Sequence, residues 1–329
     1  MLRNRTIALA AAVTGLLLAV SACSSGGAPK SDNTRQDAGG NAGGTRHTIA
    51  MVTHEQPGTT FWDRVRAGAE QAAKNDNVEL KYSGDPAQDK QATMVQNAID
   101  SKVDGIAATL AAPDAVGPML KKASDAGIPT VAFNAGIDTY QKYGALMYFG
   151  SDESLAGEAA GKRLADEGGK KALCIVHAEG VSSLEARCAG VKKSYPNTEN
   201  LQVNGADLAS ATSTIQAKLT QDKSITDIVT LDAGVATAAL AAQDAAGTKA
   251  KIVTFDLNTD VVKAIQDGKI EFCIDQQPYL QGYLAVDSLW LNITNGNDIG
   301  GGKPVLTGPS FVDKNNIDRI AQFAANNTR

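Results

Sequence analysis

The segment HTIAMVTHEQPGTTFWDRVRAGA, residues 47–69, contains the unit from which most of the chain is built. It opens with a β-rich apolar run, passes through a turn, and continues with apolar residues at helical spacing, among them Phe61, Val65 and Ala69. A strand that leads into a helix through a short turn is the basic unit of an α/β fold. The segment therefore predicts a strand that ends near Thr53, followed by a helix that Phe61 opens.

The same unit recurs along the first half of the chain. VELKYS at 78–83 precedes a second segment with helical spacing, DGIAATL at 104–110 precedes a third, and IPTVAFN at 128–134 follows it. The resulting order β-α-β-α-β-α-β is typical of a parallel sheet with helices on both faces. The predicted strands are apolar throughout, as expected for strands that are buried on both sides.

A second series of units begins after a less regular passage that ends at residues 146–152. The strands predicted for this series are 170–177, 200–206, 226–232, 251–256 and 269–275. The helices after the first four of them are predicted to begin near Ser183, Thr212, Gly234 and Thr259. Two similar series without a long linker predict an α/β protein of two doubly wound parallel-sheet lobes, packed about a cleft. One large continuous sheet is the alternative.

The length and charge of the chain limit the classes of function. A chain of 329 residues is long enough for two domains with hydrophobic cores of their own. Its formal net charge is −5, it has no basic stripe, and it contains two tryptophans for base stacking. These features argue against a nucleic-acid partner, because such a partner requires positive charge against its phosphates.

The first residues have the pattern of a bacterial export signal, predicted over residues 1–22. Arg3 and Arg5 precede an apolar run that is too short for a comfortable membrane span. The run ends in VSAC, which resembles the lipobox of lipoproteins, whose cysteine, here Cys23, is lipidated. An ordinary signal with an incidental cysteine is the alternative. Residues 23–46 are predicted to be a flexible tether, so that the folded body lies outside the cytoplasm, lipid-anchored to the cell membrane.

Three cysteines remain in the exported part of the chain, Cys174, Cys188 and Cys273. In an oxidising compartment two of them can form a disulfide, and the third stays unpaired unless it pairs between chains. Cys174 lies about three residues before a predicted strand end, and Cys188 about five residues into the helix that returns along that strand. These similar heights favour a Cys174–Cys188 disulfide, and three buried thiols are the alternative.

Polar residues follow nearly every predicted strand. In open parallel sheets, ligands bind at the carboxyl ends of the strands, where loops present side chains. The groups at these ends are Thr53-His54-Glu55, Asn134-Ala135-Gly136, His177-Ala178-Glu179, Asp232-Ala233-Gly234, Asp256-Leu257-Asn258 and Asp275-Gln276-Gln277. Phe61 and Trp62 open the first helix, also on the side of the cleft. The sequence therefore predicts a polar site with an aromatic component.

With these positions the chain resembles the type I periplasmic binding proteins, the sugar-binding subunits of ABC importers. The resemblance extends from residue 47 to the C-terminus. It rests on the segments FWDRVRAGAE, FNAG, LEARCAGVKK, IVTFDLNTDVVKAIQDGKI and IDQQPYLQGY, in this order behind a lipobox. It implies a three-stranded hinge, with crossings near Gly150, near Gln276 and near residues 307–311.

These crossings define the two lobes that the resemblance implies. The N-terminal lobe would comprise residues 47–149 and 277–308, and the C-terminal lobe residues 150–276 and 309–329. The segment IDQQPYLQGY, residues 274–283, contains the second crossing, where two glutamines follow a strand and Pro278 begins a helix. Proline is tolerated in a first helical turn because its missing N–H would be unpaired there in any case. Gln276 would face the ligand.

A sugar site needs polar groups around the rim of the sugar and an aromatic ring against its C–H face. Burying such polar groups is tolerable because the sugar hydroxyls satisfy them. The resemblance implies that Phe61 or Trp62 stacks on the sugar, although aromatic residues at a helix start are often part of a core. It also implies that Asn134 and Gln276 both donate and accept hydrogen bonds.

The charged candidates follow from the same resemblance. Arg187 would direct two donors to adjacent ligand oxygens, and Asp232 and Asp256 would accept from hydroxyls while keeping Arg187 paired. A surface or hinge network of salt bridges is the alternative role for them. The remaining candidates are His54, His177, Thr59 and Glu55, and the alternative for the histidines is a structural role.

The ligand stays open within this class. Ribose-binding relatives carry an Asp-Arg pair where this chain has Asn134-Ala135-Gly136, which removes a charge pair and leaves more room. A monosaccharide, a sugar alcohol and an inositol-like polyol are all compatible with the sequence.

Other chemistries are poorly supported. GEAAGK at 157–162 has three residues between its glycines, where a phosphate loop has four, and Arg163 stands where Ser or Thr would bind magnesium. No G-x-S-x-G, H-E-x-x-H or C-x-x-C motif occurs, and the three histidines are far apart in sequence. No cofactor, metal site or catalytic residue is predicted.

The leading hypothesis is therefore capture of a sugar without turnover. A monomer would close its lobes on the ligand, because the ligand contacts both lobes in the closed form alone. The resemblance implies delivery to an ABC permease that a separate ATPase drives. Two alternatives are a receptor that presents a sugar-like signal to a membrane sensor, and an enzyme that uses Asp232 and Asp256 as a carboxylate pair.

Overall fold

The computed structural model describes residues 44–56 and 58–329, and these contain ten α-helices and twelve β-strands. The predicted export signal (1–22), the lipidated Cys23 and most of the predicted tether (23–46) lie outside the described residues. No helix in the described part of the chain is both long enough and apolar enough to cross a membrane.

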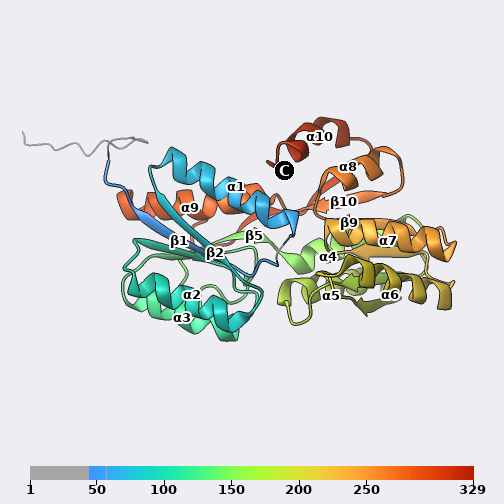
Figure 1. The fold of residues 1–329 in the computed structure, drawn as a ribbon, viewed down its shortest axis with the longest axis horizontal. Coiled ribbons are helices and arrows are strands. Elements are labelled where there is room, and N and C mark those ends of the chain that lie inside the picture. Colours follow the sequence, from blue (N-terminus) through green and yellow to red (C-terminus); the bar gives the residue numbers. More distant parts are fainter. Residues whose placement is uncertain (1–43, 57) are drawn as a thin grey trace, which may run out of the picture. The chain divides into compact units, whose positions relative to one another are not determined.

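The first sheet has the strand order β11-β5-β4-β3-β1-β2, with all neighbouring strands parallel. Its strands are β1 (Thr48–Thr53), β2 (Glu79–Gly84), β3 (Gly105–Ala108), β4 (Thr130–Phe133), β5 (Met147–Ser151) and β11 (Val305–Gly308). Helices α1 (Thr60–Asn75) and α9 (Pro278–Asn295) cover one face (Figure 1). Helices α2 (Gln88–Asp100) and α3 (Pro113–Asp125) cover the other.

The second sheet repeats this arrangement in the order β12-β10-β9-β8-β6-β7. Its strands are β6 (Ala172–Val176), β7 (Thr198–Gln202), β8 (Asp227–Thr230), β9 (Lys251–Phe255), β10 (Phe272–Asp275) and β12 (Ser310–Asp313). One face packs against α4 (Glu153–Asp166) and α5 (Ser182–Ser194). The other face packs against α6 (Leu208–Gln221), α7 (Ala233–Ala246), α8 (Thr259–Gln266) and α10 (Ile317–Ala325). Two separate α/β sheets confirm the predicted fold class.

Four hydrophobic cores, one on each face of each sheet, explain why the central strands are apolar at successive positions. In β6, Leu173 and Ile175 belong to the core beneath α6 and α7, whereas Cys174 and Val176 belong to the core beneath α4 and α5. Side chains alternate between the faces of a strand, so a strand covered on both sides needs apolar residues throughout.

The sequence prediction is wrong for some peripheral elements. β2 and β7 lie at the edges of their sheets and are partly exposed, so they are not buried on both sides. β12 pairs antiparallel with β10, so the second sheet is not wholly parallel. Helix α6 begins at Leu208 and not near Thr212, because the Asp207 carboxylate caps it by accepting from the Ser210 amide at 3.0 Å.

The chain passes between the sheets three times: from β5 into α4, from β10 into α9, and from β11 into β12. The lobe boundaries expected from the sequence, at residues 149–150, 276–277 and 308–309, stay a prediction: the first lies inside β5, and the other two lie between the elements that these passages join. Gln277 ties two of them together, since its Nε2 donates to the carbonyl oxygen of Thr307 at 2.7 Å. Its backbone has a φ of 56°, which turns the chain sharply between strand and helix.

Glycines allow one close helix pair in each lobe. A side chain at Gly157 of α4 would meet the carbonyl of Arg187 in α5, and one at Gly190 of α5 would meet that of Ser154. In the other lobe, Gly68 of α1 and Gly282 of α9 lie against main-chain atoms of the opposite helix in the same way. The glycines of the GEAAGK segment therefore serve helix packing, which agrees with its rejection as a phosphate loop.

The same region contains a disulfide. Cys174 in β6 and Cys188 in α5 are bonded, with 5.8 Å between their Cα atoms. This is the pair that the sequence favoured. Cys273 is a free, buried thiol in β10.

Candidate functional site

A cavity of about 930 Å³ lies where the carboxyl ends of strands from both sheets meet. This volume is within the range of small-molecule sites, roughly 300 to 1,000 Å³. The cavity is lined by all nine residues proposed from the sequence: His54, Phe61, Trp62, Asn134, His177, Arg187, Asp232, Asp256 and Gln276. It therefore brings together side chains that lie far apart in the sequence, from both lobes and from the hinge.

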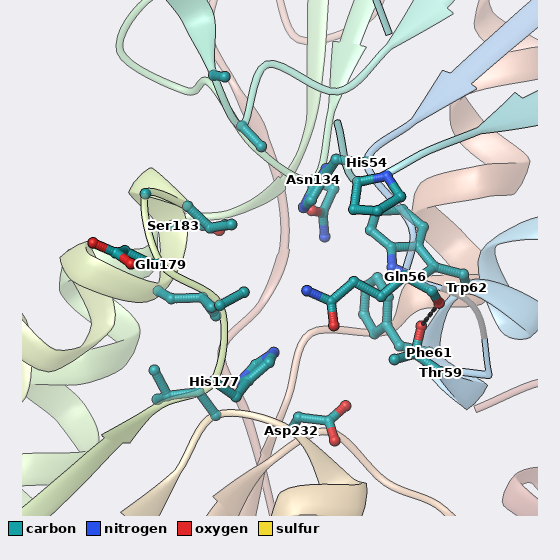
Figure 2. A pocket seen from close by; sticks show the side chains of 18 of the residues that line it. His54, Gln56, Thr59, Phe61, Trp62, Asn134, His177, Glu179, Ser183 and Asp232 are labelled. Carbon is teal, nitrogen blue, oxygen red and sulfur yellow. Dashed lines mark hydrogen bonds between the residues drawn. The ribbon is translucent and has the colours of Figure 1, made fainter. Parts of the chain in front are cut away.

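Of the two further candidates, Thr59 and Glu55, one lines the cavity. Thr59 lines it, and its hydroxyl donates to the carbonyl oxygen of Gln56 at 2.8 Å (Figure 2). Glu55 is bound elsewhere, since its carboxylate accepts from Arg66 at 3.1 Å and from the Tyr82 hydroxyl at 2.7 Å. The proposal of Glu55 as a ligand contact is thus wrong, because these partners on the outside of the lobe hold its side chain.

Two strand ends turn sharply towards the cavity. Asn134 follows β4 with a φ of 63°, and Asp256 follows β9 with a φ of 66°. Residues other than glycine seldom adopt this left-handed conformation, and asparagine and aspartate tolerate it best. The two turns place a carboxamide from one lobe and a carboxylate from the other on the same cavity.

An aromatic wall closes the side of the cavity formed by the first lobe (Figure 2). Phe61 and Trp62 meet edge to face, with ring centroids 5.0 Å apart, and Trp62 meets His54 in the same manner at 4.8 Å. Both Phe61 and Trp62 also belong to the core beneath α1 and α9. Phe61 and Trp62 can therefore belong to the hydrophobic core and also present a ring face to a ligand.

Arg187 has a different partner from the one expected. Its guanidinium forms a bidentate ion pair with Glu153, with Nε–Oε2 and Nη2–Oε1 distances of 2.6 and 3.1 Å, and its Nη1 donates to the carbonyl oxygen of Leu231. The expectation that Asp232 and Asp256 keep Arg187 paired is wrong, because Glu153 in the first turn of α4 reaches it across the close α4–α5 contact. Burial alone would lower the pKa of Arg187, but the Glu153 carboxylate outweighs it and the pKa is raised.

Sequence reasoning missed Glu153, which is buried together with Arg187. The signal available was indirect: an acidic residue two positions after the first hinge strand, followed by glycines that permit close packing of two helices. The same reasoning missed Gln56, whose side chain extends into the cavity from the loop after β1 (Figure 2).

The carboxylates of the site have distinct environments. Asp232 Oδ1 caps α7, accepting from the amides of Gly234 and Val235 at 2.7 and 3.1 Å. Asp256 Oδ1 accepts from Gln276 Nε2 at 2.9 Å. Burial raises the pKa of Asp256 to about 7, although the Arg187 charge and the Gln276 hydrogen bond act in the opposite direction.

Both histidines of the site are neutral near pH 7. Burial, and to a smaller extent the charge of Arg187, lower the pKa of His54 to about 3. The pKa of His177 is also lowered, chiefly by burial. His54 Nδ1 lies 2.8 Å from the Thr109 hydroxyl, so the position of one ring nitrogen is fixed. Each imidazole can therefore offer a ligand a donor or an acceptor without a charge.

The two lobes touch at the rim of the cavity. Ser182, the first residue of α5, donates its hydroxyl proton to the carbonyl oxygen of Ala111, which follows β3 in the other lobe, at 3.1 Å. Ala111 and the neighbouring Ser183 line the cavity. A ligand in the cavity would thus be enclosed between residues of both lobes.

Comparison with known proteins identifies relatives over most of the chain. A family described as a periplasmic binding protein domain matches residues 49–298. The xylose/arabinose-binding protein XylF of Sulfolobus acidocaldarius is 25% identical over 296 residues, which are 82% of this chain and 71% of that protein. The ribose import binding protein RbsB of Haemophilus influenzae is 28% identical over 248 residues, which are 72% of this chain and 82% of that protein.

A solved structure agrees more closely. A carbohydrate transporter from Acidothermus cellulolyticus 11B, in complex with myo-inositol, is 54% identical to this chain. The two structures have a TM-score of 0.85, covering 87% of this chain and 100% of the other. These relatives are named as binding or transport proteins and not as enzymes.

Proposed function

Because the chain belongs to the periplasmic binding protein family, we propose that it captures a monosaccharide or polyol between its lobes and delivers it to an ABC import permease. The family and its sugar-binding relatives establish a binding protein outside the cytoplasm and not an enzyme. We propose three further points: which ligand is bound, which residues of this chain contact it, and that it is delivered to a permease.

One observation carries the proposal: hydrogen-bonding groups from both lobes and the hinge line one cavity beside an aromatic wall. Amide, imidazole, carboxylate and guanidinium groups offer both donors and acceptors, as the hydroxyls of a polyol require. Buried polar groups of this kind need partners, and hydroxyls around a ring supply them. The aromatic wall suits the C–H face of such a ring.

Among polyols, a cyclitol such as myo-inositol is the favoured ligand. The structure that is 54% identical to this chain contains myo-inositol. The turn Asn134-Ala135-Gly136 brings a neutral amide to the cavity, and a ring that carries a hydroxyl on every carbon can meet donors and acceptors from several sides of the cavity.

A thermal-shift panel of myo-inositol, D-ribose, D-xylose, D-arabinose and D-glucose tests this function. A ligand that binds the folded state alone raises the melting temperature by mass action. We expect myo-inositol to give the largest shift and to be recovered unchanged. If none of the five raises the melting temperature, sugar capture is not the function of this cavity.

We also propose that Cys23 carries the lipid anchor, on the basis of the VSAC sequence and the polar segment after it. Expression in a bacterial host should yield a membrane-bound protein whose N-terminal peptide contains acylated Cys23. The Cys23→Ser variant should be released from the membrane with its ligand affinity unchanged. Membrane retention of this variant would contradict the anchor and leave sugar capture untouched.

A further inference from the structure

A network of buried amides lies behind the binding cavity, at the point where the two lobes meet. Asn134 Nδ2 donates to Gln276 Oε1 at 3.3 Å and to Gln281 Oε1 at 3.1 Å. Gln276 Nε2 donates in turn to Asp256 Oδ1 at 2.9 Å. Asn134, Gln276 and Asp256 line the cavity, whereas Gln281 is fully buried in α9 and does not.

Two acceptors fix the orientation of the Gln281 amide. Its Nε2 lies 3.1 Å from the backbone carbonyl oxygen of Gln276, which can only accept. The Thr307 hydroxyl donates its proton to that same carbonyl at 2.7 Å, so the Thr307 oxygen accepts from Gln281 Nε2 at 3.1 Å. Both contacts require a nitrogen at this position, and Oε1 of Gln281 must therefore face Asn134.

The orientation of the Gln281 amide determines the orientation of the Asn134 amide, which lines the cavity. Gln281 Oε1 needs a donor, so Asn134 turns Nδ2 inward, where the two acceptors Gln281 Oε1 and Gln276 Oε1 engage it. No hydrogen bond among the described residues uses Asn134 Oδ1, which leaves this acceptor for a ligand. Gln276 has one N–H on Asp256 and its second N–H free to donate.

We propose that Gln281 is a positioning residue that fixes the hydrogen-bonding sense of the site, so that Asn134 accepts from one ligand hydroxyl while Gln276 donates to its neighbour. The inference rests on the proposed function and narrows its ligand class to compounds with two adjacent free hydroxyls. A ligand that carries an acceptor without a proton, such as fluorine or an ether oxygen, at the Asn134 position leaves two acceptors facing each other and is rejected.

The test compares myo-inositol with its mono-deoxyfluoro derivatives, one for each ring position, by calorimetric titration. Fluorine can accept a hydrogen bond weakly but cannot donate one. In the unmodified protein we expect at least one derivative to bind roughly ten- to a hundredfold more weakly than myo-inositol, because Asn134 Oδ1 is left buried without a donor.

The Gln281→Met variant should narrow this difference several-fold. In the unmodified protein, an Asn134 amide turned over would set Oδ1 against two acceptors, Gln281 Oε1 and Gln276 Oε1. With Gln281 Oε1 removed it would meet Gln276 Oε1 alone, so turning over costs less and Nδ2 can face the cavity, where it meets the acceptor of the ligand. A merely structural loss would weaken all ligands equally and leave their ratio unchanged. The matched control is Ser288→Ala, a fully buried position on the same helix that lies outside the network and should preserve the ratio.

Each outcome decides the matter. The inference is supported if the loss of affinity caused by fluorine is smaller in Gln281→Met than in the unmodified protein and is unchanged in Ser288→Ala. It is overturned if the two variants show the same loss of affinity. Absence of any penalty in the unmodified protein overturns it as well. If Gln281→Met does not fold, Thr307→Val removes the hydroxyl that orients Gln281 and should narrow the penalty in its place. Failure of the unmodified protein to bind any sugar or polyol overturns the proposed function itself, which distinguishes the two failures.

Discussion

Arg187 shows why a charged residue can line a buried cavity without destabilising the fold. Its guanidinium is buried, and Glu153 neutralises it through two hydrogen bonds. The fixed pair directs the remaining N–H groups of Arg187, which lines the cavity. Breaking a buried pair leaves an uncompensated charge, which typically costs about 3 to 5 kcal/mol.

The Arg187→Ala variant should therefore lose both sugar binding and stability. Removal of the donors should abolish binding measurable by calorimetry, and the unpaired Glu153 should lower the free energy of unfolding by about 3 to 5 kcal/mol. The loss of stability follows from the contact with Glu153, which the sequence did not reveal.

A double variant separates the two effects. Arg187→Ala combined with Glu153→Gln removes both charges, so chemical denaturation should show most of the lost stability restored while binding stays absent. Binding by either variant with unchanged affinity would remove Arg187 from the site.

Asp256 should make sugar binding depend on pH. Its pKa is raised from 3.8 to about 7, so the folded protein without ligand holds a proton there between these values. This group contributes stability at low pH, which is lost as the pH rises from 3.8 towards 7. Hydroxyls that donate to the carboxylate favour its ionised form, so affinity should increase as the pH rises from about 6 to about 8, with release of a proton.

Titrations in buffers of different ionisation enthalpy measure this proton. The Asp256→Asn variant should bind more weakly at pH 8 and show a flat profile. His54 does not confuse the result, because its pKa of about 3 lies far below this window. A pH-independent affinity in the unmodified protein would contradict the role of Asp256.

The sequence predicted many of the residues that line the cavity, because strand ends meet at one edge of a parallel sheet. That rule needs no knowledge of packing, and it brought His54, Asn134, His177 and Asp232 onto one list. It could not place Glu153, whose contact depends on how closely two helices approach. It could not place Gln281 either, because a glutamine is ordinarily exposed, whereas Gln281 lies on the buried face of α9 together with Ala285.

At the level of elements, the α4–α5 pair connects the hinge to residues that line the cavity. α4 begins directly after β5, and the glycine contacts hold it against α5, which carries Arg187 and Cys188. The α1–α9 pair has the same role in the other lobe, where the first turn of α1 positions Phe61 and Trp62 and the first turn of α9 positions Gln281.

Gly157→Ala tests this connection. Alanine favours a helix by about 1 kcal/mol relative to glycine, yet here its methyl group would meet the Arg187 carbonyl. We expect a net loss of roughly 1 to 3 kcal/mol in unfolding free energy, together with weaker sugar binding as α5 moves. Ser154→Ala, an exposed position on the same helix, should change neither quantity. A more stable Gly157→Ala variant would show that the two helices can separate freely.

The disulfide between β6 and α5 should stabilise the same region. Its ends are 14 residues apart, and closing a loop of about this length contributes roughly 3 kcal/mol to the free energy of unfolding. The double variant Cys174→Ala with Cys188→Ala should lose about that amount in chemical denaturation. Alkylation in denaturant without a reductant should modify Cys273 and spare Cys174 and Cys188. Modification of all three would contradict the bond.

At the level of the whole molecule, the repeat of strand and helix determined the fold, and the sequence displayed that repeat openly. The order β5-β4-β3-β1-β2 in one sheet and β10-β9-β8-β6-β7 in the other arise from one pattern used twice. β11, β12 and α10 were not predicted as elements, because their sequences are short and their partners lie far away in the chain. Their positions depend on the hinge, which no local pattern reveals.

The contact between Ser182 and Ala111 should slow the release of ligand, because it joins the lobes at the rim of the cavity. Loss of one hydrogen bond of about 0.5 to 1.5 kcal/mol predicts a dissociation rate that is roughly two- to tenfold faster in Ser182→Ala, with the association rate almost unchanged. Stopped-flow fluorescence of Trp62 can follow both rates. Ser210→Ala, an exposed position on α6, should behave like the unmodified protein. Equal dissociation rates in both variants would show that this contact does not hold the lobes.

Calorimetric titration with myo-inositol, followed by chemical analysis of the recovered ligand, tests whether the cavity captures a polyol without converting it. We predict one molecule bound per chain, released chemically intact, and no binding by the Arg187→Ala, Glu153→Gln double variant. Conversion of the ligand, or full binding by that variant, would show that the residues gathered here do not form a sugar-capture site.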